Sequence, residues 1–382
     1  MRSAKPSDAM ASDYLSIYRD RRVLVTGHTG FKGSWLAFLL DEIGAEVSGY
    51  ALAPAYADSH FEKLGLARTI RHVEGDVRDA VKLDAVLSEF QPEFVFHLAA
   101  QALVRTSYAE PKATFDTNVG GSVNLLEAVR ACSSVRSLVY ITSDKAYENV
   151  EWLWGYREND RLGGHDPYSA SKAAAEIVFS AYARSFFAQR PELGAASTRA
   201  GNVIGGGDWA TDRIVPDCVR ALNSGAPIRL RHPAATRPWQ HVLEPLSGYL
   251  LLGARLRSAP DEFGGAWNFG PAAGEVRTVR DVAERLVAQF GSGSIDIEGA
   301  VAVQHEAGLL QLNCDKARQL LGWLPRWDFD ATMDATALWY KEVLAGADAA
   351  DVTRRQLHEY FPGLRWGDDR YERFTSGPPG NL

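Results

Sequence analysis

An apolar segment that runs into a glycine-rich turn, and then into a second apolar segment, restricts the fold of this chain most strongly. The first segment spans residues 21–26, the turn residues 27–33, and the second segment residues 34–40. This order predicts a buried strand, a tight turn and a helix, in which glycines let the backbone approach a pyrophosphate at the helix N-terminus. A turn that only packs the helix against a sheet is the alternative.

The glycine spacing narrows the class of nucleotide ligand further. Gly27, Gly30 and Gly33 stand three and three apart, which differs from the two-and-three spacing of the general dinucleotide fingerprint. Ser34 follows Gly33, so the turn lacks the Lys-Ser/Thr pair of a Walker loop. Nucleotide hydrolysis is therefore disfavoured.

Strand-like and helix-like segments alternate along the first half of the chain. Short apolar strands separated by helices are typical of a parallel sheet, so we expect an α/β fold with a Rossmann-type doubly wound sheet. Asp79 and Pro111 signal helix starts before residues 81–90 and 119–129, and residues 266–270 are expected to return to the sheet as a late strand. The other predicted strands are residues 23–26, 46–51, 70–74, 94–98, 137–142 and 196–200.

The sequence becomes rich in glycine and proline after residue 200, which suggests loops over a cleft. We predict a dinucleotide-binding domain at 20–200 that includes a returning segment at 241–270. Residues 201–240 and 271–350 are expected to form a smaller C-terminal α/β domain for the substrate. The N-terminal extension 1–19 lacks the apolar core of a signal peptide and is expected to be frayed, and 351–382 is expected to be an irregular tail.

Charge and cysteine content exclude several classes of protein. The 382 residues carry a net charge of −7 and no basic stripe, which gives no electrostatic basis for nucleic-acid binding. The longest apolar stretch near a helix, 246–256, is too short to span a membrane. Three separated cysteines, Cys132, Cys218 and Cys314, fit inert thiols in a reducing cytoplasm, and the scattered histidines lack metal-ligand spacing, so we expect no metal site.

Two short segments indicate the chemistry. Thr142-Ser143-Asp144-Lys145 follows a strand, and Tyr168-Ser169-Ala170-Ser171-Lys172 opens a helix on which Tyr168 and Lys172 share a face. A free phenol titrates near pH ~10, so a tyrosine base at neutral pH needs a nearby cation. A second copy of this spacing, Tyr108 to Lys112, contains Pro111, which separates the two side chains. Taken alone, the Tyr168–Lys172 spacing also fits an alternative in which both residues merely lie on the surface of a helix.

Longer strings extend the pattern from about residue 23 to 327: VLVTGHTGFKGSWL, HLAAQALVRTSY, ITSDKAYEN, WGYREND, DPYSASK, RAGNVIGGGDWA and RPWQHVLEPLSGYL. With these strings the chain resembles the extended short-chain dehydrogenase/reductase family. Within its nucleotide-sugar branch, the chain is most similar to the 4,6-dehydratases that act on CDP-glucose. The resemblance implies a lyase of deoxysugar biosynthesis, of the kind that supplies lipopolysaccharide O-antigens, with NAD as cofactor and CDP-glucose as substrate.

The family's reaction moves hydride from C4 to C6 of the hexose and removes water, giving a 4-keto-6-deoxy sugar. The resemblance implies that Tyr168 takes the C4 hydroxyl proton, that Ser143 bonds this hydroxyl, and that Lys172 holds the nicotinamide ribose and lowers the tyrosine pKa. Asp144 and Lys145 offer an acid and a base for elimination. Lys145 stands where the thymidine-nucleotide enzymes have glutamate. It is either a neutral base, a charged stabiliser of the enolate, or a surface ion-pair partner.

The resemblance also implies the ligand contacts. The second strand lacks the acidic residue that commonly holds the adenosine ribose. NAD is favoured, although Lys32 offers a contact for the 2′-phosphate of NADP. The expected cofactor contacts are Gly27, Thr29, Gly30, Phe31, Lys32, Gly33, Asp76, Val77, Leu98, Ala99, Ala100, Tyr168 and Lys172.

Expected substrate contacts are Asn202, Arg213, Arg237, Trp239 and Gln101, with Trp209 as another candidate for the base. For Gln101 and the two tryptophans, the alternative to substrate contact is a structural role in packing. The small residues after Lys172 resemble the family's dimer helix and imply a homodimer. Two other functions use the same scaffold: a 4-epimerase or other sugar-nucleotide oxidoreductase would need no acid/base pair at Asp144 and Lys145, and a cofactor sensor would need no tyrosine base.

Overall fold

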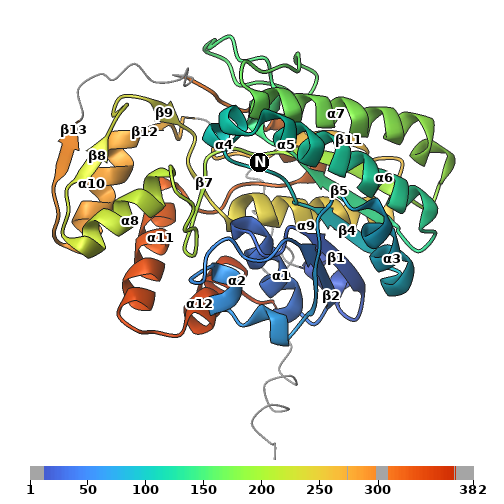
Figure 1. Ribbon diagram of the computed structural model, residues 1–382, viewed down its shortest axis with the longest axis horizontal. Coiled ribbons are helices and arrows are strands. Elements are labelled where there is room, and N and C mark those ends of the chain that lie inside the picture. Colours follow the sequence, from blue (N-terminus) through green and yellow to red (C-terminus); the bar gives the residue numbers. More distant parts are fainter. Residues whose placement is uncertain (1–12, 273, 298–308, 365, 367–382) are drawn as a thin grey trace, which may run out of the picture.

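A seven-stranded sheet forms the centre of the computed structural model, which describes residues 13–272, 274–297, 309–364 and 366. Its strand order is β11-β6-β5-β4-β1-β2-β3, and every neighbouring pair is parallel (Figure 1). The strands are β1 (Arg22–Thr26), β2 (Glu46–Ala51), β3 (Arg71–Glu74), β4 (Phe94–His97), β5 (Ser137–Ile141), β6 (Gly194–Arg199) and β11 (Gly265–Asn268). The predicted parallel sheet is confirmed, including the late return of β11.

The pleat of the buried strands divides the core into two layers. In β1, Val23 and Val25 join one apolar cluster while Leu24 joins the other. In β5, Val139 belongs to the first cluster and Leu138 to the second. Successive side chains point to opposite faces of a strand, so a strand covered on both faces must be apolar throughout. This explains why these segments read as unbroken apolar runs.

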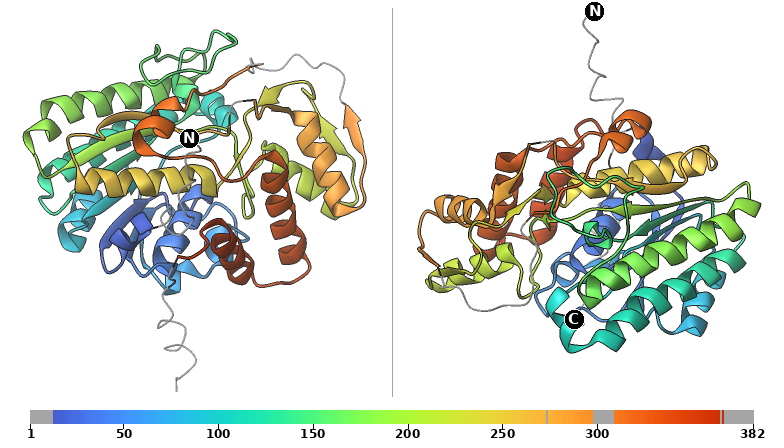
Figure 2. Two further views of the ribbon diagram at one scale, coloured as in Figure 1. Left: turned by 180° about the vertical axis from the view of Figure 1, so that it is seen from behind. Right: turned by 90° about the horizontal axis from the view of Figure 1, so that it is seen from above.

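Helices cover both faces of the sheet (Figure 2). The first cluster lies under α1 (Phe31–Glu42), α9 (Leu243–Ser258) and the 3-10 helix η1 (Asp13–Tyr18). The second lies under α3 (Ala80–Phe90), α6 (Gly121–Ala131) and α7 (Pro167–Ser185). Asp79 caps α3 by accepting a bond from the Lys82 N–H at 3.0 Å. Shorter helices connect these elements: α2 (His60–Lys63), η2 (Leu66–Arg68), α4 (Val104–Ala109), α5 (Pro111–Phe115), the π-helix η3 (Asp116–Gly120), η4 (Asp144–Ala146) and η5 (Phe187–Gln189).

A smaller group of elements lies beside the sheet, at the left of Figure 1. Three two-stranded ladders belong to this part: β10 with β7, β12 with β9, and β13 with β8. The elements are β7 (Val203–Ile204), α8 (Ile214–Ser224), β8 (Ile228–Leu230), β9 (Thr236–Arg237), β10 (Gln240–His241), β12 (Arg277–Thr278), α10 (Val279–Phe290), β13 (Ile295–Ile297), α11 (Phe329–Leu344) and α12 (Ala349–Tyr360). The π-helix η6 (Ala317–Leu321) lies at the edge of the sheet instead, where the Lys316 ammonium donates to the Ala266 carbonyl of β11 at 2.7 Å.

Both chain ends are more ordered than the sequence predicted. The prediction of a frayed N-terminal extension is wrong for η1. There, Leu15 and Tyr18 are fully buried, and the Tyr18 hydroxyl donates to the Leu250 carbonyl at 2.6 Å. The prediction of an irregular C-terminal tail is wrong for α12, where Val352 and Leu357 are buried. In each case a few apolar residues among many polar ones anchor the segment to the core. Residues 1–12 and 367–382 lie outside the described part.

One buried carboxylate ties the C-terminal helix to the core. Glu244, at the start of α9, is fully buried and accepts a bond from the Tyr360 hydroxyl at 2.7 Å. It also accepts from the backbone N–H groups of Arg326 and Trp327, at 3.0 Å and 2.8 Å. Burial raises the pKa of Glu244 to about 7, against the opposing effect of these bonds and of the Arg326 charge.

The pKa of Glu244 predicts how stability depends on pH. A carboxyl group with a raised folded-state pKa stabilises the protein most below its ordinary pKa, and this contribution is lost as pH rises through about 7. From about pH 5 to about pH 8, the unfolding free energy of the wild type should therefore fall relative to that of Glu244→Gln, by at most about 3 kcal/mol. Urea denaturation of both proteins across this range measures the difference, and a constant difference would contradict the assignment.

Candidate active site

The glycine turn has the close backbone contacts that a phosphate cradle requires. Gly27 has a φ of 76°, and a Cβ there would lie 2.7 Å from the Ala99 nitrogen. A Cβ on Gly33 would lie 2.1 Å from the Gly27 carbonyl oxygen. Helix α1 begins at Phe31, three residues earlier than predicted, with Gly30 as its N-cap and no side-chain cap. The first N–H groups of a helix have no partner within it, so this end fits a pyrophosphate.

The end of β4 forms a wall beside this turn. Leu98, Ala99 and Ala100 follow the strand and are half-buried. The Thr26 hydroxyl accepts a bond from the Ala99 N–H at 3.3 Å. The Thr29 hydroxyl donates to the Leu52 carbonyl at 2.9 Å, which closes the turn on the segment after β2. Glycines and small side chains therefore leave the backbone accessible along this edge.

At the loop after β3, two of the predicted cofactor contacts, Asp76 and Val77, have partners within the protein. The Arg78 guanidinium binds the Asp76 carboxylate at 2.5 Å, and this contact lowers the pKa of Asp76. Val77 is buried, and a Cβ on Gly121 would lie 2.6 Å from its Cγ2 atom.

Tyr168 and Lys172 share one face of α7, as predicted. Asp166 is the N-cap of this helix and accepts bonds from the Ser169 N–H at 2.9 Å and hydroxyl at 2.6 Å. Both site side chains are buried, at 7% and 6% exposure. In the second copy of the spacing, Tyr108 lies on α4 and Lys112 on α5. The structure therefore confirms that only the first copy forms one helical face.

The segment after β5 brings a hydroxyl and a carboxylate to the phenol of Tyr168. The Ser143 hydroxyl donates to the Asp144 carboxylate at 3.0 Å, and Ser143 also acts on the Tyr168 phenol, whose pKa it lowers. The Asn202 amide donates to the other Asp144 oxygen at 3.5 Å. Lys145 is half-buried on the same turn, and its backbone N–H donates to the Ser143 hydroxyl at 3.3 Å. A tyrosine, a serine and a buried aspartate thus converge at the carboxyl edge of the sheet.

The electrostatics of this cluster differ from the sequence prediction. Burial raises the pKa of Tyr168 to about 12, opposed by Ser143 and the charge of Arg213. This net rise is opposite to the lowering that the sequence suggested, and Lys172 is not among the main groups that act on the phenol. Burial, together with the charge of Lys32, lowers the pKa of Lys172 to about 7. The sequence does not reveal how completely both groups are withdrawn from water, and desolvation penalises both charged forms.

Lys32 lies on the catalytic side of the glycine turn. Burial lowers its pKa to about 8, the nearby Arg213 lowers it further, and Asp144 opposes both effects. Its charge also acts on Lys172. These interactions connect Lys32 to the catalytic cluster, whereas a contact with a 2′-phosphate would require it to reach the adenosine end.

The structure separates the remaining candidates. Arg213 precedes α8 and binds Asp208 at 2.8 Å, close enough to the cluster to influence Tyr168. Arg237 lies half-buried on β9. Trp239 is buried in the core, with its indole N–H donating to the Arg277 carbonyl at 3.2 Å, so the packing interpretation applies.

Gln101 also has a structural role. Its amide donates to the Thr114 hydroxyl at 2.9 Å, and its carbonyl oxygen accepts from the Leu103 N–H at 2.6 Å. Its backbone N–H donates to the side chain of Asn118 at 2.8 Å. The Trp209 ring packs edge-on against Tyr340.

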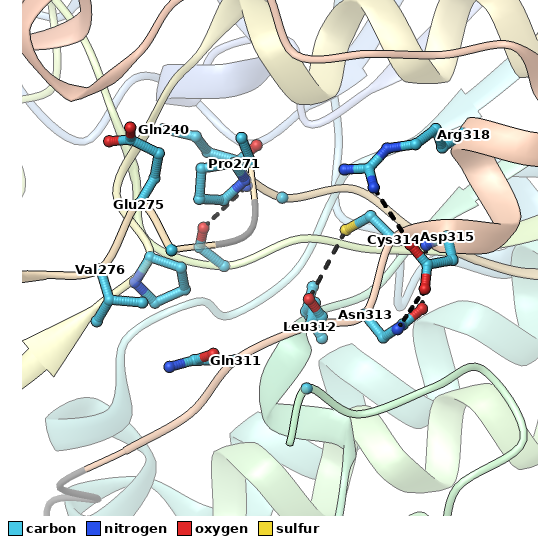
Figure 3. Close-up of a pocket in the computed structure, with 16 residues that line it drawn as sticks. Gln240, Pro271, Glu275, Val276, Gln311, Leu312, Asn313, Cys314, Asp315 and Arg318 are labelled. Atoms are coloured by element: carbon cyan, nitrogen blue, oxygen red, sulfur yellow. Dashed lines mark hydrogen bonds and ion pairs between the residues drawn. The ribbon is translucent and has the colours of Figure 1, made fainter. Parts of the chain in front are cut away.

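A cavity of about 190 Å³ opens next to the cluster (Figure 3). Gly201 lines it and also touches the cluster, because a Cβ there would lie 1.7 Å from an Asp144 oxygen. Other lining residues come from the segments after β9 and β11, from β10, from the segment before η6 and from η6 itself: Pro238, Pro271, Glu275, Gln240, Leu312, Asn313 and Arg318. The cavity therefore lies between the sheet edge and the smaller group of elements.

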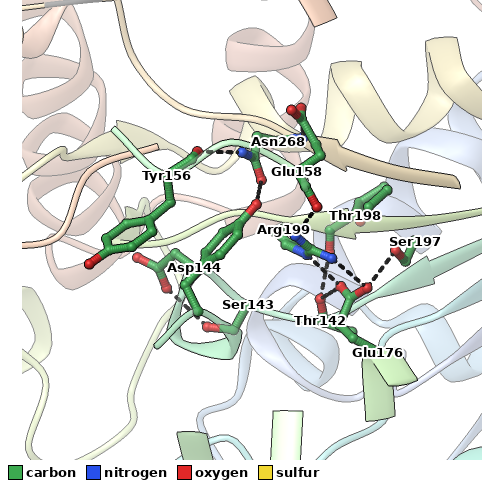
Figure 4. Close-up of polar contacts among 12 residues, drawn as sticks. Thr142, Ser143, Asp144, Tyr156, Glu158, Glu176, Ser197, Thr198, Arg199 and Asn268 are labelled. Atoms are coloured by element: carbon green, nitrogen blue, oxygen red, sulfur yellow. Dashed lines mark hydrogen bonds and ion pairs between the residues drawn. The ribbon is translucent and has the colours of Figure 1, made fainter. Parts of the chain in front are cut away.

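Sequence reasoning missed a buried polar network beneath the cluster (Figure 4). Glu176 follows Lys172 by one helical turn and forms a buried ion pair with Arg199. The Tyr-Lys-Glu spacing at four-residue intervals on one helix was the available signal. Thr142 belongs to the same network, although the sequence suggested no role for it.

The described residues contain no group of three histidine, cysteine or acidic side chains placed to hold a metal ion. All three cysteines are free and buried, as predicted. Within the described ranges, no helix is long and apolar enough to cross a membrane.

Known proteins with the same sequence pattern identify the family. The profile described as GDP-mannose 4,6 dehydratase matches residues 24–336. The chain belongs to this family. A CDP-glucose 4,6-dehydratase of Salmonella typhimurium is 46% identical over 350 residues, which cover 91% of this chain and 98% of that protein. The expected membership of the nucleotide-sugar branch is confirmed.

Solved structures share the fold of this family member. The dTDP-glucose 4,6-dehydratase DesIV of Streptomyces venezuelae, with NAD and TYD bound, is 26% identical with a TM-score of 0.72, covering 86% of this chain and 99% of that one. A UDP-glucose 4-epimerase of Thermus thermophilus in complex with NAD is 28% identical with a TM-score of 0.72, covering 84% and 99%. Dehydratases and epimerases share this fold, so the site must distinguish the two activities.

The buried lysine of α7 is expected to cost stability. The pKa of Lys172 falls from its ordinary 10.5 to about 7, so its charged form is disfavoured in the folded protein. This cost is present at low pH and disappears as pH rises toward the ordinary value. Lys172→Met should therefore raise the unfolding free energy by about 1–3 kcal/mol at pH 7, and by less at about pH 9.

Chemical denaturation at the two pH values measures this gain. Lys112→Met is the matched control, because Lys112 is an exposed partner of Asp116 and should change stability by less than about 0.5 kcal/mol. A lower unfolding free energy for Lys172→Met than for the wild type at pH 7 would contradict the prediction, because it would show that the Lys172 charge does not destabilise the fold.

Proposed function

We propose that the chain is a CDP-glucose 4,6-dehydratase, which converts CDP-glucose to CDP-4-keto-6-deoxyglucose. The observation that carries this proposal is the buried Asp144, which is hydrogen-bonded to Ser143 and acts together with it on the Tyr168 phenol. A dehydratase needs an acid/base group beside its tyrosine, whereas a 4-epimerase does not. The relative that supports the cytidine nucleotide matches nearly the whole of its own length to this chain.

NAD fits the cradle of Gly27, Gly30 and Gly33. The contacts proposed for it are Thr29, Phe31, Lys32, Asp76, Val77, Leu98, Ala99, Ala100, Tyr168 and Lys172. When bound, the nicotinamide accepts hydride from C4 of the hexose and returns it to C6. Related structures contain NAD, and the interactions of Lys32 with the catalytic cluster support NAD over NADP.

Tyr168 removes the proton of the sugar C4 hydroxyl, while Ser143 binds the same hydroxyl. Because the pKa of Tyr168 is about 12, the phenolate needs stabilisation at neutral pH. Ser143 and the charge of Arg213 provide part of it. Protonated Lys172 holds the nicotinamide ribose from the same face of α7.

Oxidation at C4 makes the C5 proton acidic, and elimination then removes the C6 hydroxyl as water. Asp144 is placed to shuttle protons in this step, since Ser143 and Asn202 hold both of its oxygens. Lys145 has two roles open to it. A neutral amine would remove the C5 proton, whereas a charged amine would stabilise the enolate.

The diphosphate of the sugar nucleotide requires cationic groups. Arg213 and Arg237 are proposed for it, with Asn202 as a contact of the sugar or phosphate. The charge of Arg213 acts on Tyr168. The cavity lined by Gly201 provides space next to Asp144.

The remaining proposals concern organisation. Residues 20–200 with 241–270 form the NAD-binding domain, and 201–240 with 271–350 form the sugar-nucleotide domain. A homodimer through α7 is proposed because Ile177 is 60% exposed and lies between Ala174 and Ala181 on one helical stripe. We place the enzyme in the cytoplasm, in deoxysugar synthesis for lipopolysaccharide O-antigens.

Isotope labelling tests the proposed reaction. CDP-glucose incubated with the protein and catalytic NAD should give a 4-keto-6-deoxy sugar without net cofactor reduction. A deuterium label at C4 should move to C6, and in deuterated water C5 should gain solvent label, both read by NMR. Retention of the C4 label at C4 of an epimer would support the 4-epimerase, and no turnover of any sugar nucleotide would support a cofactor sensor.

Asp144→Asn separates elimination from oxidation. Without the carboxylate, oxidation at C4 should still occur once while loss of water falls by at least about 100-fold. Reduced nicotinamide should then accumulate to at most one equivalent, visible in its near-ultraviolet absorbance. Asp116→Asn, a surface change at an exposed ion pair, is the matched control. Unchanged turnover by Asp144→Asn would remove Asp144 from the mechanism.

A further inference from the structure

A buried ion pair that the mechanism above does not use lies directly beneath the catalytic cluster. Glu176 and Arg199 are 3% and 4% exposed, and two hydrogen bonds join them at 2.9 Å and 3.0 Å. Glu176 lies on α7 and Arg199 ends β6. Buried ion pairs are costly to form, so this pair is weak evidence for stability as such. Its connections point to a role in the site.

On one side, the pair holds the end of β5. The Thr142 hydroxyl donates to Glu176 at 2.5 Å, and the Ser197 hydroxyl donates to it at 2.7 Å. Thr142 immediately precedes Ser143 and Asp144, so Glu176 fixes the strand end from which both project (Figure 4).

On the other side, the pair holds the segment after β5. The Arg199 guanidinium donates to the Glu158 carbonyl at 3.0 Å and lies 4.7 Å from the centre of the Tyr147 ring. The Tyr147 hydroxyl donates to Asn268 on β11 at 2.8 Å. Arg199 therefore links α7, β6 and the segment after β5.

Glu176 also supplies a negative charge to Lys172. The titratable groups that interact with Lys172 are Lys32 from α1, His97 from β4 and Glu176 from α7 itself, and Tyr168 lies on the same face of α7. Burial holds His97 neutral, with its pKa lowered to about 3, and Tyr168 is also neutral near pH 7. Among these described groups Glu176 alone is an anion. The bonds from Arg199, Thr142 and Ser197 outweigh burial and lower the pKa of Glu176, so it stays charged.

We propose that Glu176, held by Arg199, is a positioning residue that keeps Lys172 protonated and fixes Ser143 and Asp144 at the sheet edge. The inference rests on the proposed function for its kinetic readout and on the fit of NAD for its binding readout. Glu176 acts through Lys172 and Thr142, without contact with the substrate.

Glu176→Gln tests this role because it removes the charge and keeps the shape. Lys172 then loses its counter-charge, so the alkaline limb of the kcat/KM profile should move to lower pH by about one unit. NAD affinity, measured by calorimetry above that limb, should fall about tenfold. Glu176→Asp, which restores the charge, should return the limb toward its wild-type position. Glu127→Gln breaks a surface pair with Arg130 and should leave both readouts unchanged.

Glu176→Gln leaves Arg199 buried without a counter-charge, which endangers folding. Glu176→Gln with Arg199→Gln avoids this, since two amides can bond each other and the charge near Lys172 is still absent. The same pH shift is expected. An unmoved limb and unmoved NAD affinity in a folded variant would overturn the inference. A wild type without NAD binding or dehydratase turnover would instead overturn the proposed function.

Discussion

The position of β5 between β4 and β6 is the constraint on which the rest of the site depends. Its register sets Val139 opposite Phe96 on one side and Ala196 on the other, so the strand ends at the carboxyl edge of the sheet. Ser143 and Asp144 follow directly. Ligands of open α/β sheets bind at this edge, and here the edge also receives the glycine turn of β1 and the first turn of α7. One strand end therefore meets a cofactor cradle and a helix that carries a base.

Burial of charge is the cost of this arrangement. Withdrawal from water moves the pKa values of Tyr168 and Lys172 in opposite directions, toward the neutral form of each. The burial that orders the site therefore disfavours the ionised forms of Tyr168 and Lys172 that the reaction needs. Compensation comes from outside the reacting atoms, through Arg213 near the phenol and Glu176 near the ammonium. Such opposition between stability and activity is common at functional sites.

The sequence predicted the parts that local pattern determines. The bounds of β2, Glu46–Ala51, match the prediction, and all of its residues after Glu46 are buried. The shared face of Tyr168 and Lys172 followed from helical geometry. Helix α12 was missed although its buried residues recur at helical spacing, because charged residues stand between them. The raised pKa of Tyr168 and the packing role of Trp239 depend on burial by segments far away in the chain, which no local pattern contains. Glu176 was missed although its spacing from Lys172 was visible.

The account requires that the phenol, the serine hydroxyl and the carboxylate face one hexose. A crystal structure of the protein with NAD and a non-reacting CDP-glucose analogue measures this directly. The Tyr168 hydroxyl oxygen should lie within about 3.2 Å of the oxygen on C4, with Asp144 on the side of C5 and C6. A hexose bound away from Tyr168, or an Asp144 carboxylate that turns away from the sugar, would contradict the account.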